Sequence, residues 1–89
     1  MITMKQVYCI VSVTYENRVE YVARDVTYQA NGKTYIPMVD KRYDAFRFKS
    51  MKLAKKAIRD VEFDGGITKI IAIKKKKYKG RYWTFGYDN

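Results

Sequence analysis

The chain has 89 residues, a formal net charge of +10, 47% hydrophobic residues and 16% aromatic residues. This length accommodates a single domain over residues 1–89, and the apolar content excludes intrinsic disorder. No apolar run approaches the length of a membrane span, and the N-terminus lacks the layout of a signal peptide. We therefore expect a soluble, cytoplasmic protein with no membrane partner.

The positive charge is concentrated after residue 32. Residues 1–32 carry three basic and three acidic side chains, whereas the remaining residues carry sixteen basic and six acidic ones. A field of one sign on one part of a protein attracts polyanions and accelerates encounter with them. The charge distribution therefore indicates a negatively charged partner.

The first two predicted strands lie in this neutral part. Residues 6–14 place Val7, Cys9 and Val11 on one side and Tyr8 and Ile10 on the other, a pattern typical of a central strand with apolar residues on both faces. Within this strand Cys9 is expected to be a core residue. A second strand is predicted over residues 19–29, with a bulge near residues 24–25 that keeps Val26 and Tyr28 facing inward.

Asn31-Gly32 is typical of a type I′ turn, because both residues accept the positive φ angles that this turn requires. It predicts a hairpin into a third strand over residues 33–36. Pro37 has no N–H to donate, so this strand lies at an edge or ends there. Residues 39–44 are predicted to form a polar loop.

Residues 48–77 predict a helix followed by a strand. Ser50 is the expected N-cap, the helix carries an apolar stripe, and Asp64-Gly65-Gly66 is expected to end the helix. Phe46 and Phe48 are expected to pack under the helix start. A strand over residues 67–73, buried on both faces near its middle, runs into four lysines. Lys79-Gly80 then predicts a turn before a last strand over residues 81–85. The apolar stripe of the predicted helix consists of Leu53, Ala54, Ala57, Ile58 and Val61.

The predicted order is β-β-β-α-β-β, an α+β domain in which one helix packs on an antiparallel sheet of about five strands. The pattern Ala45-x-x-Phe48-x-Ser50-x-x-x-Ala54-x-x-Ala57-Ile58, with a later strand of isoleucines, resembles short phage- and prophage-encoded proteins of Gram-positive bacteria. The resemblance covers about a third of the chain and implies a small phage-type accessory protein, acting in the host cytoplasm. Those proteins largely lack assigned functions, so no site residue carries over from them.

Enzymatic chemistry is not expected. The chain has no histidine and one cysteine, which removes the usual general base and the ligand set of a structural zinc site. Asp60, Glu62 and Asp64 are close in sequence, but we expect them to face solvent separately rather than to hold magnesium. We therefore expect no catalytic residue, no metal and no cofactor.

A basic-aromatic segment near the C-terminus is the main candidate site. Phosphates attract such cations, and unpaired bases stack on flat rings. Lys75, Lys77, Arg81 and Trp83 are expected to share one face of a hairpin. Basic residues of the helix are expected to extend the surface. The segment comprises Lys74, Lys75, Lys76, Lys77, Tyr78, Lys79, Arg81, Tyr82 and Trp83, and the helix residues are Lys52, Lys55, Lys56 and Arg59.

Two other interpretations of the segment remain open. The lysines would protect a sheet edge against aggregation while the aromatics fill the core, or the segment would bind an acidic protein.

The leading hypothesis is a non-enzymatic protein that binds DNA or RNA through phosphates and unpaired bases. The alternative is a phage-type inhibitor or adaptor that binds a host enzyme or defence complex, with exposed tyrosines and tryptophan as anchors. A homodimer formed through an open sheet edge is a third possibility.

Overall fold

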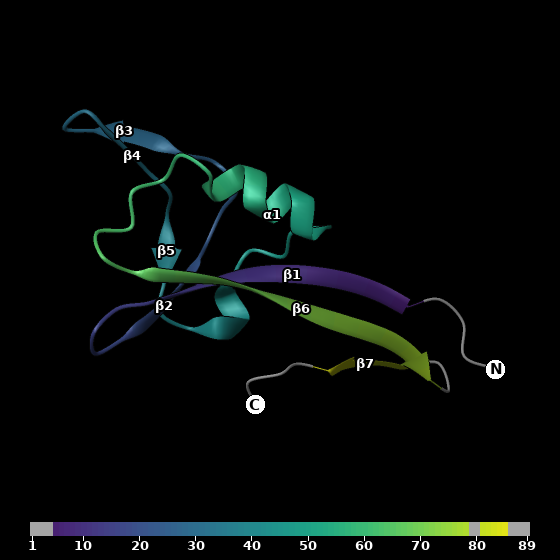
Figure 1. The fold of residues 1–89 in the computed structure, drawn as a ribbon. Helices are drawn as coiled ribbons and strands as arrows, with labels where there is room; N and C mark the ends of the chain where they lie inside the picture. The colour runs from purple at the N-terminus through teal and green to yellow at the C-terminus, as the bar shows by residue number, and fades with distance from the viewer. Residues whose placement is uncertain (1–4, 79–80, 86–89) are drawn as a thin grey trace.

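The computed structural model describes residues 5–78 and 81–85, and the side chains of residues 8–73. It contains seven strands, one 3-10 helix (η1) and one α-helix (Figure 1). In chain order these are β1 (Lys5–Thr14), β2 (Val19–Val22), β3 (Tyr28–Ala30), β4 (Lys33–Tyr35), β5 (Met38–Val39), η1 (Arg42–Asp44), α1 (Met51–Ile58), β6 (Ile67–Tyr78) and β7 (Arg81–Phe85). The predicted α+β class, with a helix packed on an antiparallel sheet, is confirmed.

The main sheet has five antiparallel strands in the order β5-β2-β1-β6-β7. Strand β1 is central, as its two apolar sides predicted, and pairs with β6 along its whole length, from Lys5 opposite Lys76 to Thr14 opposite Ile67. The long β1–β6 ladder runs across the molecule in Figure 1 and supports the elements on both sides.

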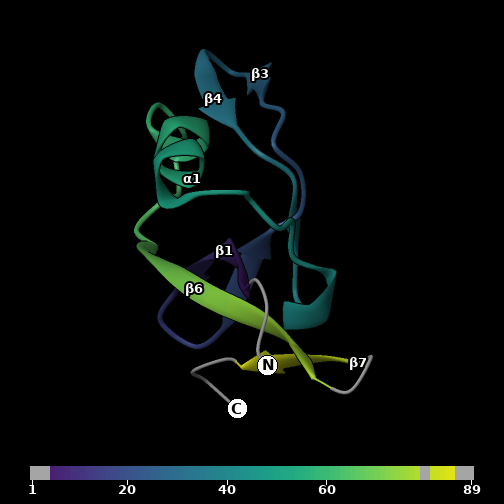
Figure 2. The same ribbon diagram turned by 90° about the vertical axis from the view of Figure 1, so that its right-hand side faces the viewer.

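The sheet buries a cluster on each face. On one face Cys9, Val11 and Val13 pack with Phe48 and with Ala54 of α1. On the other face Ile10, Ile71 and Ile73 pack under Ala45, the residue that follows η1. Figure 2 shows α1 and the η1 segment on opposite sides of β1 and β6. The predicted burial of residues 67–73 on both faces is confirmed for Ile71 and Ile73 on one face, whereas Ile70 and Ala72 on the other face are half-buried and Ile67 at the start is exposed.

The predicted second strand is wrong in its second half. Strand β2 ends at Val22, and residues 23–27 lead away from the main sheet into a separate two-stranded sheet of β3 and β4. Val26 and Tyr28 are consequently 56% and 52% exposed rather than facing inward. The turn itself is confirmed, because Asn31 and Gly32 have φ angles of 52° and 75° between the paired strands. The hairpin projects beyond the main sheet in Figure 1.

The order of elements before the helix also differs from the predicted β-β-β-α-β-β. The segment predicted as a polar loop over residues 39–44 contains the end of β5 and the 3-10 turn η1. Strand β5 pairs with β2, so Tyr21 lies opposite Val39. Pro37, between β4 and β5, still accepts a backbone hydrogen bond from Ala23 at 2.8 Å. The chain thus returns to the edge of the main sheet directly after the hairpin.

Helix α1 begins as predicted and ends earlier than predicted. The Ser50 hydroxyl accepts a hydrogen bond from the Leu53 N–H at 3.1 Å, which confirms the N-cap. The helix ends at Ile58, and residues 59–66 form turns instead of a further helical turn. Asp64 and Gly65, with φ angles of 48° and 89°, redirect the chain into β6. In the part of the chain that the structure describes, no helix has the length and apolar character to cross a membrane.

Candidate functional site

The basic side chains of α1 lie on one side of the helix and are all exposed. They recur at spacings of three and four residues, which places them along one stripe of the helix surface. The stripe lies opposite Ala54, which is fully buried against β1. We call this set the helix cations: Lys52, Lys55, Lys56 and Arg59.

The helix cations have no acidic partner among the described side chains. An ion pair among these side chains joins Arg18 to Glu20 at 3.0 Å, far from α1 in sequence. Lys52 and Lys56 are like charges four residues apart, as are Lys55 and Arg59, and each such pair destabilises a helix by roughly 0.2–0.5 kcal/mol. The helix therefore presents uncompensated positive charge to solvent at a small cost in stability.

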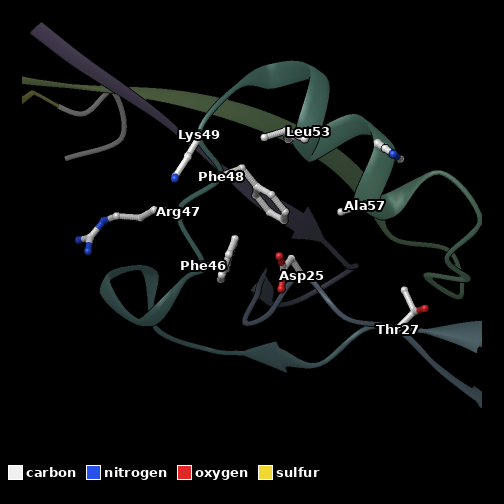
Figure 3. Close-up of a pocket in the computed structure, with 9 residues that line it drawn as sticks. Asp25, Thr27, Phe46, Arg47, Phe48, Lys49, Leu53 and Ala57 are labelled. Carbon is white, nitrogen blue, oxygen red and sulfur yellow. The ribbon is translucent and has the colours of Figure 1, made fainter.

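A groove of about 450 Å³ lies beside this stripe, between α1, residues 46–49 and residues 25–27. Figure 3 shows Leu53 and Ala57 descending from the helix and Phe46 and Phe48 beneath them. Leu53, predicted to be part of the buried stripe, is 46% exposed because the helix turns Ala54 to the sheet and leaves Leu53 at the side. The remaining lining residues are Asp25, Thr27, Arg47, Lys49 and Lys56, so Lys56 belongs to both the groove and the helix cations.

Backbone pairing fixes the wall formed by residues 46–49. The Phe46 N–H donates to the Val22 carbonyl at 2.8 Å, and Phe48 exchanges two 2.8 Å hydrogen bonds with Cys9. The segment is extended, so Phe48 points into the core while Arg47 and Lys49 are exposed. The predicted packing of Phe46 and Phe48 near the helix start is confirmed: their rings meet edge to face at 4.7 Å within the cluster that contains Ala54.

Sequence reasoning missed Arg47, Lys49 and Asp25 as candidate site residues. The signal for the first two was present, because the Phe-Arg-Phe-Lys run alternates as a half-buried strand does. Asp25 had no comparable signal. It reaches the groove only because residues 46–48 pair with both Val22 and Cys9.

The C-terminal basic segment occupies the second half of β6 and the start of β7. Lys74, Lys75, Lys76, Lys77 and Tyr78 belong to β6, whereas Arg81, Tyr82 and Trp83 belong to β7; Lys79 lies outside the described residues. The register pairs Lys76 with Trp83 and Tyr78 with Arg81. Lys75 and Lys77 lie opposite Thr84 and Tyr82 instead, so the backbone register does not pair them with Arg81 or Trp83, with which they were predicted to be grouped.

The pairing of β6 also bears on the interpretation of its lysines as edge protection. Lys74 lies between Val7 of β1 and Phe85 of β7, and Lys75 lies between Gln6 and Thr84. Among the described strands β6 is thus internal, and the edge on this side of the sheet is β7. Lysines protect an edge by standing on the unpaired strand, so this interpretation does not fit Lys74 and Lys75.

The remaining candidates are placed as follows. Asp60, Glu62 and Asp64 are exposed, as expected, on the turns after α1. Cys9 is buried in the core, also as expected, and burial raises the pKa of its thiol above the ordinary value of 9.0. A thiol held protonated inside the sheet is unsuited to nucleophilic chemistry.

Comparison with known proteins adds no family assignment: no family model, no curated protein and no solved structure matches this chain. The groove, the helix cations and the basic half of β6 are therefore the features from which a function can be inferred.

Proposed function

We propose that this protein is a small, basic, non-enzymatic nucleic-acid-binding protein that contacts the phosphate backbone and unpaired bases of DNA or RNA. In this proposal it acts as a phage-type accessory protein. The observation that carries the proposal is the stripe of exposed helix cations without acidic partners, continued by Lys56 into a groove whose rim bears Arg47 and Lys49. Several unpaired cations on one surface match the regular charges of a polyphosphate chain.

The mixed character of the surface favours single strands. An apolar groove beside cations offers contacts to the bases as well as to phosphates, and bases are accessible to it only when they are unpaired. Each neutralised phosphate of a single strand contributes about 0.7 to the slope of log K against log salt. Contacts from the four helix cations alone would therefore give a slope of about −2.8.

A titration of fluorescently labelled single-stranded oligonucleotides, followed by anisotropy at several salt concentrations, tests the proposal. We expect submicromolar binding at low salt that weakens steeply as salt increases. The variant Lys55→Glu with Arg59→Glu is expected to bind at least about tenfold more weakly, because it replaces two phosphate-binding charges with repulsive ones.

The matched control is Lys33→Glu with Lys41→Glu, which makes the same change in net charge at exposed positions outside the helix and the groove. Equal weakening by both pairs would mean that net charge alone attracts the ligand. No binding of single-stranded DNA or RNA at low salt would refute the proposed function.

A second candidate function is that of a protein inhibitor or adaptor acting on a host enzyme or defence complex. The β3–β4 hairpin and the segment before it favour this function, because Val26 and Tyr28 are largely exposed and the Tyr28 ring packs at a tilt against Tyr35, with ring centroids 5.8 Å apart. Exposed tyrosines are common anchors of protein interfaces. A stoichiometric protein partner captured from a nuclease-treated bacterial lysate, and lost with Tyr28→Ala, would support this function over the first.

A further inference from the structure

The groove beside α1 is lined by a carboxylate, that of Asp25, in addition to basic side chains. Figure 3 shows Asp25 below the ring of Phe48 and close to Phe46, with Arg47 and Lys49 on the outer side of the segment that carries them. An ionised carboxylate only accepts hydrogen bonds and repels phosphate. The interior of the groove therefore suits an uncharged, flat group that donates N–H bonds, while its rim suits a phosphate.

We propose that the groove holds a single unpaired guanine, with the Asp25 carboxylate accepting hydrogen bonds from the guanine N1–H and 2-amino group. This inference rests on the proposed function and names the base that the surface prefers. Single-stranded nucleic acids are commonly recognised by hydrogen bonds to the Watson–Crick edge of a base that stacks on an aromatic ring.

Asp25 discriminates among the bases by their hydrogen-bonding edges. Guanine presents two adjacent N–H donors, which match the two oxygens of a carboxylate in a bidentate arrangement. Adenine and cytosine each place a ring-nitrogen acceptor beside their amino group, and thymine and uracil flank their one N–H with carbonyl oxygens. In each of these bases a lone pair would face a carboxylate oxygen, so guanine is the base that the charge of Asp25 favours.

The other lining residues fit this occupant. Phe46 is partly exposed, and its edge-to-face contact with the buried Phe48 ring, at 4.7 Å, holds it in place as a stacking surface. Leu53, which belongs to α1, lines the helix side of the groove. The volume of about 450 Å³ lies within the range of about 300–1,000 Å³ typical of small-ligand sites. Arg47, Lys49 and Lys56 also line the groove, so their charges are available to the flanking phosphates of a bound nucleotide.

Anisotropy titrations with short thymidine oligonucleotides test the inference. One oligonucleotide carries a single central guanine, and others carry adenine, inosine or only thymine at that position. The guanine oligonucleotide is expected to bind about tenfold more tightly than the all-thymine one, the difference that hydrogen bonds to a charged group supply. Inosine, which lacks the 2-amino group, is expected to bind more weakly than guanine. The same series in RNA, with uridine replacing thymidine, is expected to keep the order.

Asp25→Asn is the informative variant, because it keeps the shape of an exposed side chain and removes one of the two acceptors. It should abolish the preference for guanine while leaving binding of the all-thymine oligonucleotide at least as tight. Asp40→Asn, an equal charge change at an exposed residue outside the groove, is the control and should keep the preference.

The outcomes separate this inference from the proposed function. Salt-dependent binding with equal affinity for every oligonucleotide, or a guanine preference that survives Asp25→Asn, would overturn the guanine site and leave the proposed function standing. The absence of binding to all oligonucleotides would overturn both.

Discussion

Gly66 is required by the close approach of the turn after α1 to strand β1. A Cβ atom at this position would collide with the Val13 side chain and would lie 2.8 Å from the Tyr15 ring. Val13 is fully buried, so it has no free space into which to move. The glycine therefore lets residues 59–66 pack directly on the end of the sheet.

Gly66→Ala is expected to destabilise the protein by about 1–3 kcal/mol, the usual cost of overpacking a filled site. Urea denaturation measures the change. Combined with Val13→Ala, which removes the nearest atom, the loss should be smaller than the sum of the two single losses. Additive losses would show that the two positions do not meet.

The buried thiol of Cys9 makes stability depend on alkaline pH. Its pKa is raised by burial, so the native thiol stays protonated while the thiol of the unfolded chain ionises near its ordinary pKa of 9.0. The unfolded state then binds fewer protons than the native state, and stability falls as pH rises from 9.0 toward the raised native pKa. Well below 9.0 both states keep the thiol protonated, and the thiol contributes no pH dependence.

The measurement is the free energy of unfolding of the wild type and of Cys9→Ala from about pH 8 to about pH 10. Other groups titrate equally in both proteins, so the difference between the two isolates the thiol. We expect the wild type to lose up to about 1.4 kcal/mol per pH unit more than the variant above the ordinary thiol pKa. Parallel curves would contradict a buried, protonated Cys9.

At the scale of elements, helix α1 exchanges stability for surface charge. Lys52 occupies the first turn, where the helix dipole favours an acidic side chain, and it faces Lys56 one turn later. Acidic residues are absent from that first turn. A sequence selected for helix stability alone would place glutamate there.

Lys52→Glu is therefore expected to stabilise the protein by roughly 0.4–1 kcal/mol, because a repulsive pair with Lys56 becomes an attractive one. It should raise the Tm by about 2–8 °C and weaken binding to single strands in the same preparation. If the variant is more stable than the wild type and still binds single strands more weakly, misfolding cannot explain the loss of affinity. Thermal unfolding with a parallel anisotropy titration checks both, and unchanged affinity would remove Lys52 from the interface.

The elements that the sequence predicted well are those with local signals. Ser50 caps a helix whose first N–H groups lie three residues away, and Asn31-Gly32 forms its turn from its own φ angles. The prediction failed at Val26 and Tyr28, because their alternation fits any half-buried strand and does not specify which sheet the strand joins. The helix end was misplaced for a similar reason: Val61 packs against the core from a turn as well as it would from a helix.

The candidate site divides in the same way. The helix cations were predictable because their spacing of three and four residues is a property of one helix. The groove was not, because Asp25 and Phe46 are brought together by the hydrogen bond from Phe46 to Val22 and by the return of residues 46–48 to strand β1. Contacts of this kind depend on the tertiary pairing of distant segments, which composition and periodicity do not encode.

At the scale of the whole molecule, two groups of basic residues lie on an elongated body of 52 × 25 × 16 Å. The helix cations lie on α1, which packs on β1 and β6, and the lysines at positions 74–77 lie on the continuation of β6. In Figure 1 this half of β6 extends past the helix toward the β7 end of the sheet. Under the proposed function, one extended strand of nucleic acid that followed β6 is expected to contact both groups.

This arrangement leads to a prediction about the salt dependence. If Lys74 and Lys76, whose register positions continue the face of the sheet that carries α1, contact the same strand as Lys55 and Arg59, replacing either pair with glutamine should reduce the slope of log K against log salt by about 1.4. Replacing both pairs should reduce it by about 2.8, since each pair releases its own counterions. Glutamine at Lys33 and Lys41, outside the proposed path, should leave the slope nearly unchanged. The measurement is anisotropy with an oligonucleotide long enough to span the molecule, between about 50 and 200 mM salt. A combined variant with the same slope as one of the pairs would assign the phosphate contacts to a single group, and the path along β6 would be wrong.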